Sequence, residues 1–239
     1  MVLSPQNLAA NVRAVRERIA AAAARCGRNA DSITLVAASK AQPLTAIEAA
    51  ARAGVAHFGE SYLKEGLAKI EGVAKSSALA GLELTWHFIG HLQANKTRPV
   101  AERFAWVHSV DRLKLAQRLS AQRPHYAPPL NVCIEVNLGA EPGKAGVTPE
   151  EARALAAAVA ALPRVRLRGL MCLPPEEREE ARQRRWFAEL RGLFEALNAE
   201  GAGLDTLSMG MSADLEAAVL EGATLVRVGT ALFGPRPQP

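Results

Sequence analysis

Residues 206–229 read TLSMGMSADLEAAVLEGATLVRVG, and this stretch contains one complete strand–helix–strand unit. Short apolar runs at 206–210 and 224–229 are typical of buried strands, and the segment between them has the apolar spacing of a helix. We expect Ser212 to cap that helix and Gly222 to end it, because a hydroxyl accepts a hydrogen bond from a free N–H and glycine tolerates the turn after a helix. Strands joined through such a helix are parallel.

The same alternation of short apolar runs and helical patterns extends along the whole chain. It predicts eight strands, at ITLVAAS (33–39), AHFGE (56–60), WHFIG (86–90), WVHSV (106–110), NVCIEVNL (131–138), RLRGLMCL (166–173), TLSMG (206–210) and TLVRVG (224–229). Further helix starts are expected at Pro43, Asp111 and Thr148, and an additional helix over residues 5–26 precedes the first strand.

Eight strand–helix repeats in 239 residues match the size and order of a single (β/α)8 barrel of the TIM type, with an extra N-terminal helix. An open, doubly wound sheet would more often carry about six strands and a GxGxxG fingerprint after the first, which this chain lacks. No linker or low-complexity segment divides residues 1–239, so we expect one α/β domain.

Composition and net charge restrict the cellular compartment in which we expect the protein and the classes of partner that we expect it to bind. Lys and Arg exceed Asp and Glu by 29 to 24, but the basic residues of 112–123 and 178–185 lie on predicted helices without interleaved aromatic strands. This pattern favours solvated helix faces over a nucleic-acid site. The three cysteines are far apart, and no apolar segment resembles a signal peptide or a membrane span. We therefore expect a cytoplasmic protein with no nucleic-acid or membrane partner.

Lys40 is the first candidate functional residue along the chain. In a barrel, the loops at the carboxyl ends of the strands converge on one opening, and functional residues gather there. Lys40 ends the first predicted strand and shares a face with Thr34, Val36 and Ala38 by two-residue alternation. A poorly hydrated lysine has a lowered pKa, and its free amine can condense with an aldehyde. A lysine whose stem extends into solvent fits the same position, so both interpretations stay open.

Arg227 lies inside the eighth predicted strand, between Val226 and Val228. A buried guanidinium is costly unless an acceptor meets it. The fifth strand offers Glu135, on the face that it shares with Asn137, as an internal partner. A ligand atom could equally serve, and the sequence leaves the two alternatives open.

Small residues follow the last two strands. Ser208, Gly210 and Ser212 follow the seventh strand, and Gly229 and Thr230 follow the eighth. Such residues expose backbone N–H groups, and barrels commonly bind phosphate at these two turns. Tight turns without a ligand would use the same residues.

Several site classes have no support in the sequence. The five histidines form no HExxH pair, and there is no GxSxG elbow, Walker-type phosphate loop or calcium loop. We interpret His87 as a core or pocket-lining residue. An aldehyde that carries a phosphate fits the remaining candidates.

With these residues identified, the sequence resembles the pyridoxal phosphate homeostasis protein family, which is itself similar to the N-terminal barrel of alanine racemase. The resemblance runs nearly end to end through LVAASKAQP around Lys40, HFGESYLKE (57–65), WHFIGHLQANKTR (86–98), VNLGAEPGKAGV (136–147), GLMCLPP (169–175) and LSMGMSADLEAAVLEGATLVRVGTALFG (207–234).

The resemblance implies that the protein binds pyridoxal 5'-phosphate (PLP) as a covalent aldimine on Lys40. It implies that Ser208, with the turn at Gly229 and Thr230, receives the phosphate, and that Arg227 faces the pyridine nitrogen. A cation beside that nitrogen disfavours its protonation and weakens the ring as an electron sink. Chemistry at the α-carbon of an amino acid is thereby discouraged.

Two more residues belong to the expected cofactor-binding set, Ser61 and Asn137. The family usually reads FGEN at the end of the second strand, and this chain has Ser61 in place of that Asn. A hydroxyl is shorter and offers fewer hydrogen-bonding groups than an amide. The contact with the ring is therefore expected to be lost or bridged by water.

The leading functional hypothesis is a non-catalytic PLP-binding protein that buffers or delivers the cofactor, with PLP-dependent apoenzymes as candidate recipients. Similar racemases use a second domain that supplies a tyrosine base, whereas this chain ends at Pro239 and neither Tyr62 nor Tyr126 can be given that role. Without that domain a monomer is expected. The alternatives are a weak PLP-dependent amino-acid racemase and a barrel that binds another phosphorylated metabolite through Lys40 as a simple cation.

Overall fold

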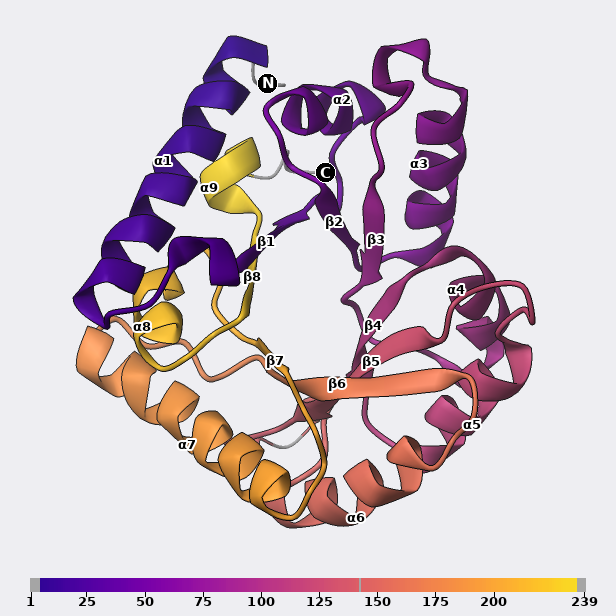
Figure 1. Ribbon diagram of the computed structural model, residues 1–239. Helices are drawn as coiled ribbons and strands as arrows, with labels where there is room; N and C mark the ends of the chain where they lie inside the picture. Colours follow the sequence, from indigo (N-terminus) through magenta and orange to yellow (C-terminus); the bar gives the residue numbers. More distant parts are fainter. Residues whose placement is uncertain (1–4, 142, 236–239) are drawn as a thin grey trace.

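The computed structural model describes residues 5–141 and 143–235. Within these residues eight parallel strands close into a barrel in chain order (Figure 1). The strands are β1 (Thr34–Ala38), β2 (His57–Glu60), β3 (Thr85–Phe88), β4 (Trp106–Val110), β5 (Leu130–Val136), β6 (Val165–Cys172), β7 (Thr206–Ser208) and β8 (Leu225–Val228). Each overlaps one predicted run, so the predicted TIM-type (β/α)8 barrel is confirmed.

Helices form a layer around the barrel (Figure 1). The α-helices are α1 (Pro5–Arg25), α2 (Leu44–Arg52), α3 (Leu63–Lys75), α4 (Thr97–Arg103), α5 (Leu113–Gln122), α6 (Pro149–Ala160), α7 (Glu180–Ala199), α8 (Leu215–Leu220) and α9 (Thr230–Phe233). Short 3-10 turns are η1 (Ala30–Ser32), η2 (Ser77–Leu79) and η3 (Ala94–Lys96). The expected N-terminal helix is α1, which packs against α2, α8 and α9.

Two of the predicted helix boundaries are confirmed, one by its hydrogen bonds and one by its backbone conformation. The Thr148 hydroxyl accepts a hydrogen bond from the Glu151 N–H at 3.2 Å, and the Glu151 carboxylate accepts from the Thr148 N–H at 2.9 Å. This reciprocal pair starts α6. Gly222, with φ of 96°, follows the end of α8 in the left-handed conformation that glycine tolerates.

Two other cap predictions are wrong. The residues that cap α5 and α8 are Arg112 and Asp214, and the predicted caps Asp111 and Ser212 lie outside both helices. Asp111 instead pairs with Arg112 at 2.8 Å. The Ser212 hydroxyl accepts from the Ala231 N–H at 3.1 Å, so it joins the turn after β7 to the turn after β8.

Successive side chains along each strand point to opposite sides of the barrel wall, so the protein has two separate cores. Phe58, Val107 and Val226 are fully buried in the apolar layer between strands and helices. The barrel interior is polar instead, and it includes the fully buried His87 and His108. The prediction that His87 is a core residue is confirmed, and the polar interior positions the site described below.

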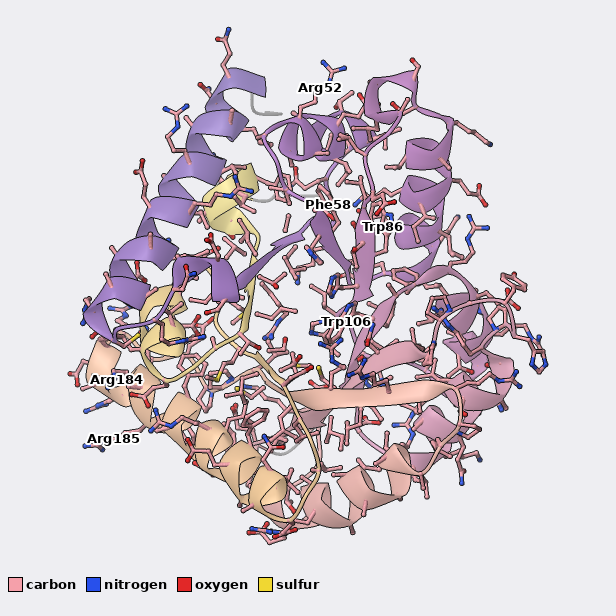
Figure 2. All side chains as sticks on the ribbon, viewed as in Figure 1. Arg52, Phe58, Trp86, Trp106, Arg184 and Arg185 are labelled. Atoms are coloured by element: carbon pink, nitrogen blue, oxygen red, sulfur yellow. The ribbon has the colours of Figure 1, made fainter. Side chains whose placement is uncertain are left out.

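Most of the basic helix residues are exposed, as predicted. Arg184 and Arg185 point outward from α7 (Figure 2). Arg123 departs from the prediction, because it is buried and donates to the carbonyls of Ala101 at 2.6 Å and Phe104 at 2.7 Å. Among residues 5–141 and 143–235 we find no helix with the length and apolar character needed to cross a membrane.

Strands β6 and β7 approach each other closely at Gly169, and this contact generates a stability prediction. A Cβ atom added at Gly169 would lie 1.7 Å from the Thr206 carbonyl oxygen. Gly169→Ala must therefore separate the two strands, and we expect a loss of about 3 kcal/mol in the free energy of unfolding, measured in urea.

The matched control is Gly192→Ala on α7, where an added Cβ meets nothing within 4 Å. Because alanine favours a helix over glycine, this variant should gain roughly 0.5–1 kcal/mol. Equal stabilities for the two variants would contradict the proposed β6–β7 contact.

Candidate functional site

Two adjoining cavities lie among the loops that follow the strands. The smaller, of about 260 Å³, is lined by residues after β1, β7 and β8, and the larger, of about 1010 Å³, by residues after β2, β3 and β5. Lys40, Ser61, Ile89 and Leu173 line both cavities. Lys40 therefore stands at their junction, at the end of the barrel where the sequence predicted it.

Lys40 lies in a turn whose two flanking residues are anchored. β1 ends at Ala38, and Lys40 is half-buried two residues later. Ala41 has φ of 61°, a conformation unusual for a residue other than glycine, and its N–H donates to Glu65 Oε1 at 2.6 Å. On the other side the Ser39 N–H donates to the Gly59 carbonyl at 2.9 Å. The backbone that carries the Lys40 amine is thus fixed on both sides.

A second lysine, which the sequence analysis missed, holds this turn together. Lys69 Nζ donates to the Ser39 carbonyl at 2.6 Å, to Glu60 Oε1 at 2.7 Å and to Glu65 Oε1 at 2.6 Å. The side chains of Lys69 and Glu60 are only 7% and 0% exposed. Burial raises the pKa of Glu60, while the Lys69 charge opposes that shift. We call Ser39, Glu60, Glu65 and Lys69 the clamp. The four-residue spacing of Glu65 and Lys69 was its only signal in the sequence.

Arg227 reaches the smaller cavity from inside the barrel. Its Nη1 donates to Ser208 Oγ at 2.6 Å and its Nη2 to the Cys172 carbonyl at 2.9 Å. Burial lowers the pKa of Arg227. Of the two alternatives left open, an ion pair with Glu135 is not found among the described residues, and Arg227 lines the smaller cavity instead.

The structure brings Gly229 and Thr230 to the smaller cavity, but it does not bring Ser208 there. Ser208 is fully buried, and its hydroxyl is engaged by Arg227 and by His108 Nδ1 at 2.7 Å. Ser212 lines the cavity together with Gly229 and Thr230. β7 ends at Ser208, so only the residues beyond the turn at Gly210 reach the opening.

Ser61 and Asn137 occupy different parts of the site. Ser61 lines both cavities, and its backbone packs so tightly on Gly90 that an added Cβ there would lie 2.3 Å from the Ser61 carbonyl oxygen. Asn137 lines the larger cavity only. Its side-chain amide donates to the Glu141 carbonyl at 3.1 Å and accepts from the Glu141 N–H at 3.3 Å, which ties down the loop after β5.

The larger cavity also contains a carboxyl group and a tyrosine. Burial, together with the neighbouring charge of Asp111, raises the pKa of Glu135 to about 7, against the opposing effect of Arg227. Tyr62 lines this cavity and is 61% exposed, whereas Tyr126 is 91% exposed and lines neither cavity. An amine, a guanidinium and a titratable carboxyl group therefore line the two adjoining cavities.

Comparison with known proteins first shows the structural class to which the barrel belongs. Residues 4–237 match the family model described as alanine racemase, N-terminal domain. The solved alanine racemase of Clostridium difficile 630 superposes with a TM-score of 0.72 at 15% identity, over 95% of this chain and 57% of that one. This likeness shows the fold alone, and the chain is a barrel of the alanine racemase N-terminal class.

The particular family follows from more similar proteins. The chain is 55% identical to the pyridoxal phosphate homeostasis protein of Pseudomonas aeruginosa, over 96% of both, and 50% identical to that of Escherichia coli K12, over 96% of this chain and 97% of the relative. PipY of Synechococcus elongatus, solved with PLP bound, superposes with a TM-score of 0.79 at 38% identity, over 92% of this chain and 100% of that one. The chain belongs to the pyridoxal phosphate homeostasis protein family.

The clamp generates a second stability prediction. Lys69→Met leaves two carboxylates and a carbonyl without their buried cation, and we expect a loss of about 3–5 kcal/mol in the free energy of unfolding. The control is Lys75→Met at the exposed end of the same helix, which should change stability by less than about 0.5 kcal/mol. Similar urea midpoints for the two variants would show that the clamp does not stabilise the turn.

Glu135 generates a prediction for pH dependence. Its pKa is about 7 in the folded protein, against an ordinary value of 4.5, so the folded state binds the proton more tightly than the unfolded state does. The contribution of Glu135 to stability therefore falls as the pH rises through this interval, by at most roughly 3–4 kcal/mol.

Thermal unfolding of the wild type and Glu135→Gln between about pH 4.5 and pH 7 measures this contribution. The variant should become more stable relative to the wild type as the pH rises, because glutamine does not ionise. A constant difference across the interval would contradict the raised pKa.

Proposed function

We propose that this protein binds PLP within one barrel domain and acts in the cytoplasm as a monomeric, non-catalytic buffer or carrier of the coenzyme. The observation that carries the proposal is the smaller cavity, in which Lys40 and Arg227 lie with the small residues Ser212, Gly229 and Thr230. The names of the relatives and the PLP-bound structure of PipY support it. PLP-dependent apoenzymes are the proposed recipients.

The residues present fit the chemical groups of this coenzyme. An aldehyde needs an amine, which Lys40 supplies at the junction of the cavities. A phosphate needs a space free of bulky side chains and lined by hydroxyl and N–H donors, and Ser212, Gly229 and Thr230 provide it. An added Cβ at Gly229 would lie 3.2 Å from the Ala38 carbonyl oxygen, so this turn approaches β1 closely. We therefore assign the phosphate to Ser212 in place of Ser208.

The Lys40 amine holds the coenzyme covalently in this proposal. The amine would condense with the aldehyde of the coenzyme and release one molecule of water. The clamp fixes the backbone on both sides of Lys40, so the amine is presented from a rigid turn. When bound, PLP supplies an electron-withdrawing ring conjugated to that bond.

Arg227 favours a carrier over a strong enzyme. Its guanidinium is held by two neutral acceptors, the Ser208 hydroxyl and the Cys172 carbonyl, and faces the cavity. A fixed positive charge beside the ring nitrogen disfavours protonation there. Ser61 lines the cavity with a hydroxyl that is shorter than the amide usual in the family, so its contact with the ring would be lost or bridged by water.

One observation favours weak racemase activity as a second candidate function. Tyr62 and Lys40 line the same large cavity, so two groups capable of proton transfer share one space. If racemisation occurs, turnover of alanine should be lost in both Lys40→Ala and Tyr62→Phe. Turnover below detection in the wild type, with PLP bound, is the outcome expected of a carrier.

The central test is reductive trapping. We expect borohydride treatment of the PLP-loaded protein to label the peptide that contains Lys40, and Lys40→Ala to lose both the label and the visible absorption band. Lys96→Ala is the matched control, because Lys96 lines the larger cavity only. A label on another lysine would overturn the covalent assignment. If the wild-type protein retained a phosphorylated ligand but showed no visible absorption band, the result would favour the alternative in which Lys40 acts as a simple cation.

A further inference from the structure

A chain of hydrogen-bonded rings crosses the barrel beneath the smaller cavity. His57 Nδ1 lies 3.0 Å from His87 Nε2, His87 Nδ1 lies 2.9 Å from His108 Nε2, and His108 Nδ1 lies 2.7 Å from Ser208 Oγ. Ser208 Oγ in turn lies 2.6 Å from Arg227 Nη1. These residues come from five different strands, so the chain connects the start of β2 to the guanidinium that faces the cavity.

The direction of every hydrogen bond in this chain follows from its cationic end. A guanidinium only donates, so Ser208 Oγ accepts from Arg227. The Ser208 hydroxyl hydrogen then needs an acceptor, and His108 Nδ1 is the one that lies within reach. His108 must therefore carry its proton on Nε2 and donate to His87 Nδ1, and His87 must donate through Nε2 to His57 Nδ1. The opposite order would leave the buried hydroxyl hydrogen unsatisfied.

We infer that His57, His87 and His108 form a hydrogen-bond chain of fixed direction that holds Ser208 as an acceptor for Arg227, and that His108 is thereby a positioning residue for the guanidinium. The direction of the chain stands without the proposed function. Its consequence for the coenzyme, that Arg227 is presented to the ring nitrogen at a constant orientation, rests on that function.

The surroundings keep the rings in place and uncharged. Trp106 stacks on His87 with a centroid distance of 5.4 Å and an interplanar angle of 14°, so the imidazole cannot rotate freely. Arg168 lies over the outer Trp106 ring at 4.8 Å. Burial lowers the pKa of His87 and of His108 well below the ordinary value, and the charge of Arg227 acts on His108 in the same direction. Neutral rings with one donor and one acceptor each are what such a chain requires.

The first test reads the proton positions directly in the coenzyme-free protein. Two-bond nitrogen–hydrogen correlation spectra of the ¹⁵N-labelled histidine rings distinguish the two neutral tautomers. We expect His57, His87 and His108 to show the proton on Nε2, with the exposed His91 as an internal reference. A proton on Nδ1 of His108 would overturn the inference. Because no PLP is present, this result does not depend on the proposed function.

The second test asks whether His108 and Ser208 act as one unit on the guanidinium. We expect His108→Leu and Ser208→Ala each to weaken PLP binding about tenfold, and the double variant to weaken it no further, because each change disrupts the same hydrogen-bonded contact between Ser208 and Arg227. His108→Asn, which keeps an acceptor on the Ser208 side, should recover most of the affinity even where stability is reduced. Multiplicative effects in the double variant would overturn the inference, as would equal affinities of His108→Asn and His108→Leu.

The matched control is Ser120→Ala on α5, another buried serine that lies outside the chain and accepts from the Arg164 N–H. It should bind PLP as the wild type does. If wild-type PLP binding were itself absent while the tautomers were as expected, the proposed function would fail and the chain would stand.

Discussion

A guanidinium placed inside a closed barrel constrains the rest of this structure. Arg227 is 4% exposed, and its hydrogen-bonding partners within the described residues are a hydroxyl and a backbone carbonyl. A buried cation without a paired carboxylate is stable only where aligned neutral dipoles replace its hydration. The Ser208 hydroxyl on the neighbouring strand β7 accepts from Arg227, and His108 on β4 accepts from that hydroxyl, so the polar interior meets this requirement. The side of the guanidinium that these acceptors leave uncovered faces the smaller cavity.

Lys69 and Lys40 have different roles in the site because their surroundings differ. Lys69 uses its three donors on the clamp and is almost fully buried, so it acts as a structural cation. Lys40 is half-buried in the turn that the clamp holds and lines both cavities. Immobilisation of the Lys69 ammonium thus fixes the backbone that carries Lys40, and an amine carried by a rigid backbone loses less entropy on binding an aldehyde.

Much of the fold and part of the site could be predicted from the sequence. The eight strands were found because buried parallel strands are short apolar runs, and Lys40 and Arg227 were found because each interrupts or ends such a run. Ser208 was expected to receive the phosphate, but a sequence pattern does not reveal how deep a strand end lies, and Ser208 is fully buried outside the cavity lining. Ser212, two residues beyond Gly210, is the serine that reaches the cavity.

The clamp and the histidine chain could not be predicted, for a related reason. Lys69 lies on a helix and reaches back to β1, and His57, His87 and His108 lie on three different strands. Their contacts depend on the register and closure of the barrel, and no local sequence pattern encodes these. The caps assigned to Asp111 and Ser212 failed because both side chains bond elsewhere, Asp111 to Arg112 and Ser212 to the Ala231 N–H, and both helices begin later than the predicted caps would allow.

The two adjoining cavities have a kinetic consequence. A ligand that fills the 260 Å³ cavity leaves the 1010 Å³ cavity open beside Lys40. Water and small amines can then reach a bond made at that nitrogen without any opening of the barrel. Access of solvent and of competing nucleophiles through the larger cavity therefore bears on the lifetime of such a bond. Reversible storage, with release on demand by an incoming amine, is the behaviour that this geometry allows.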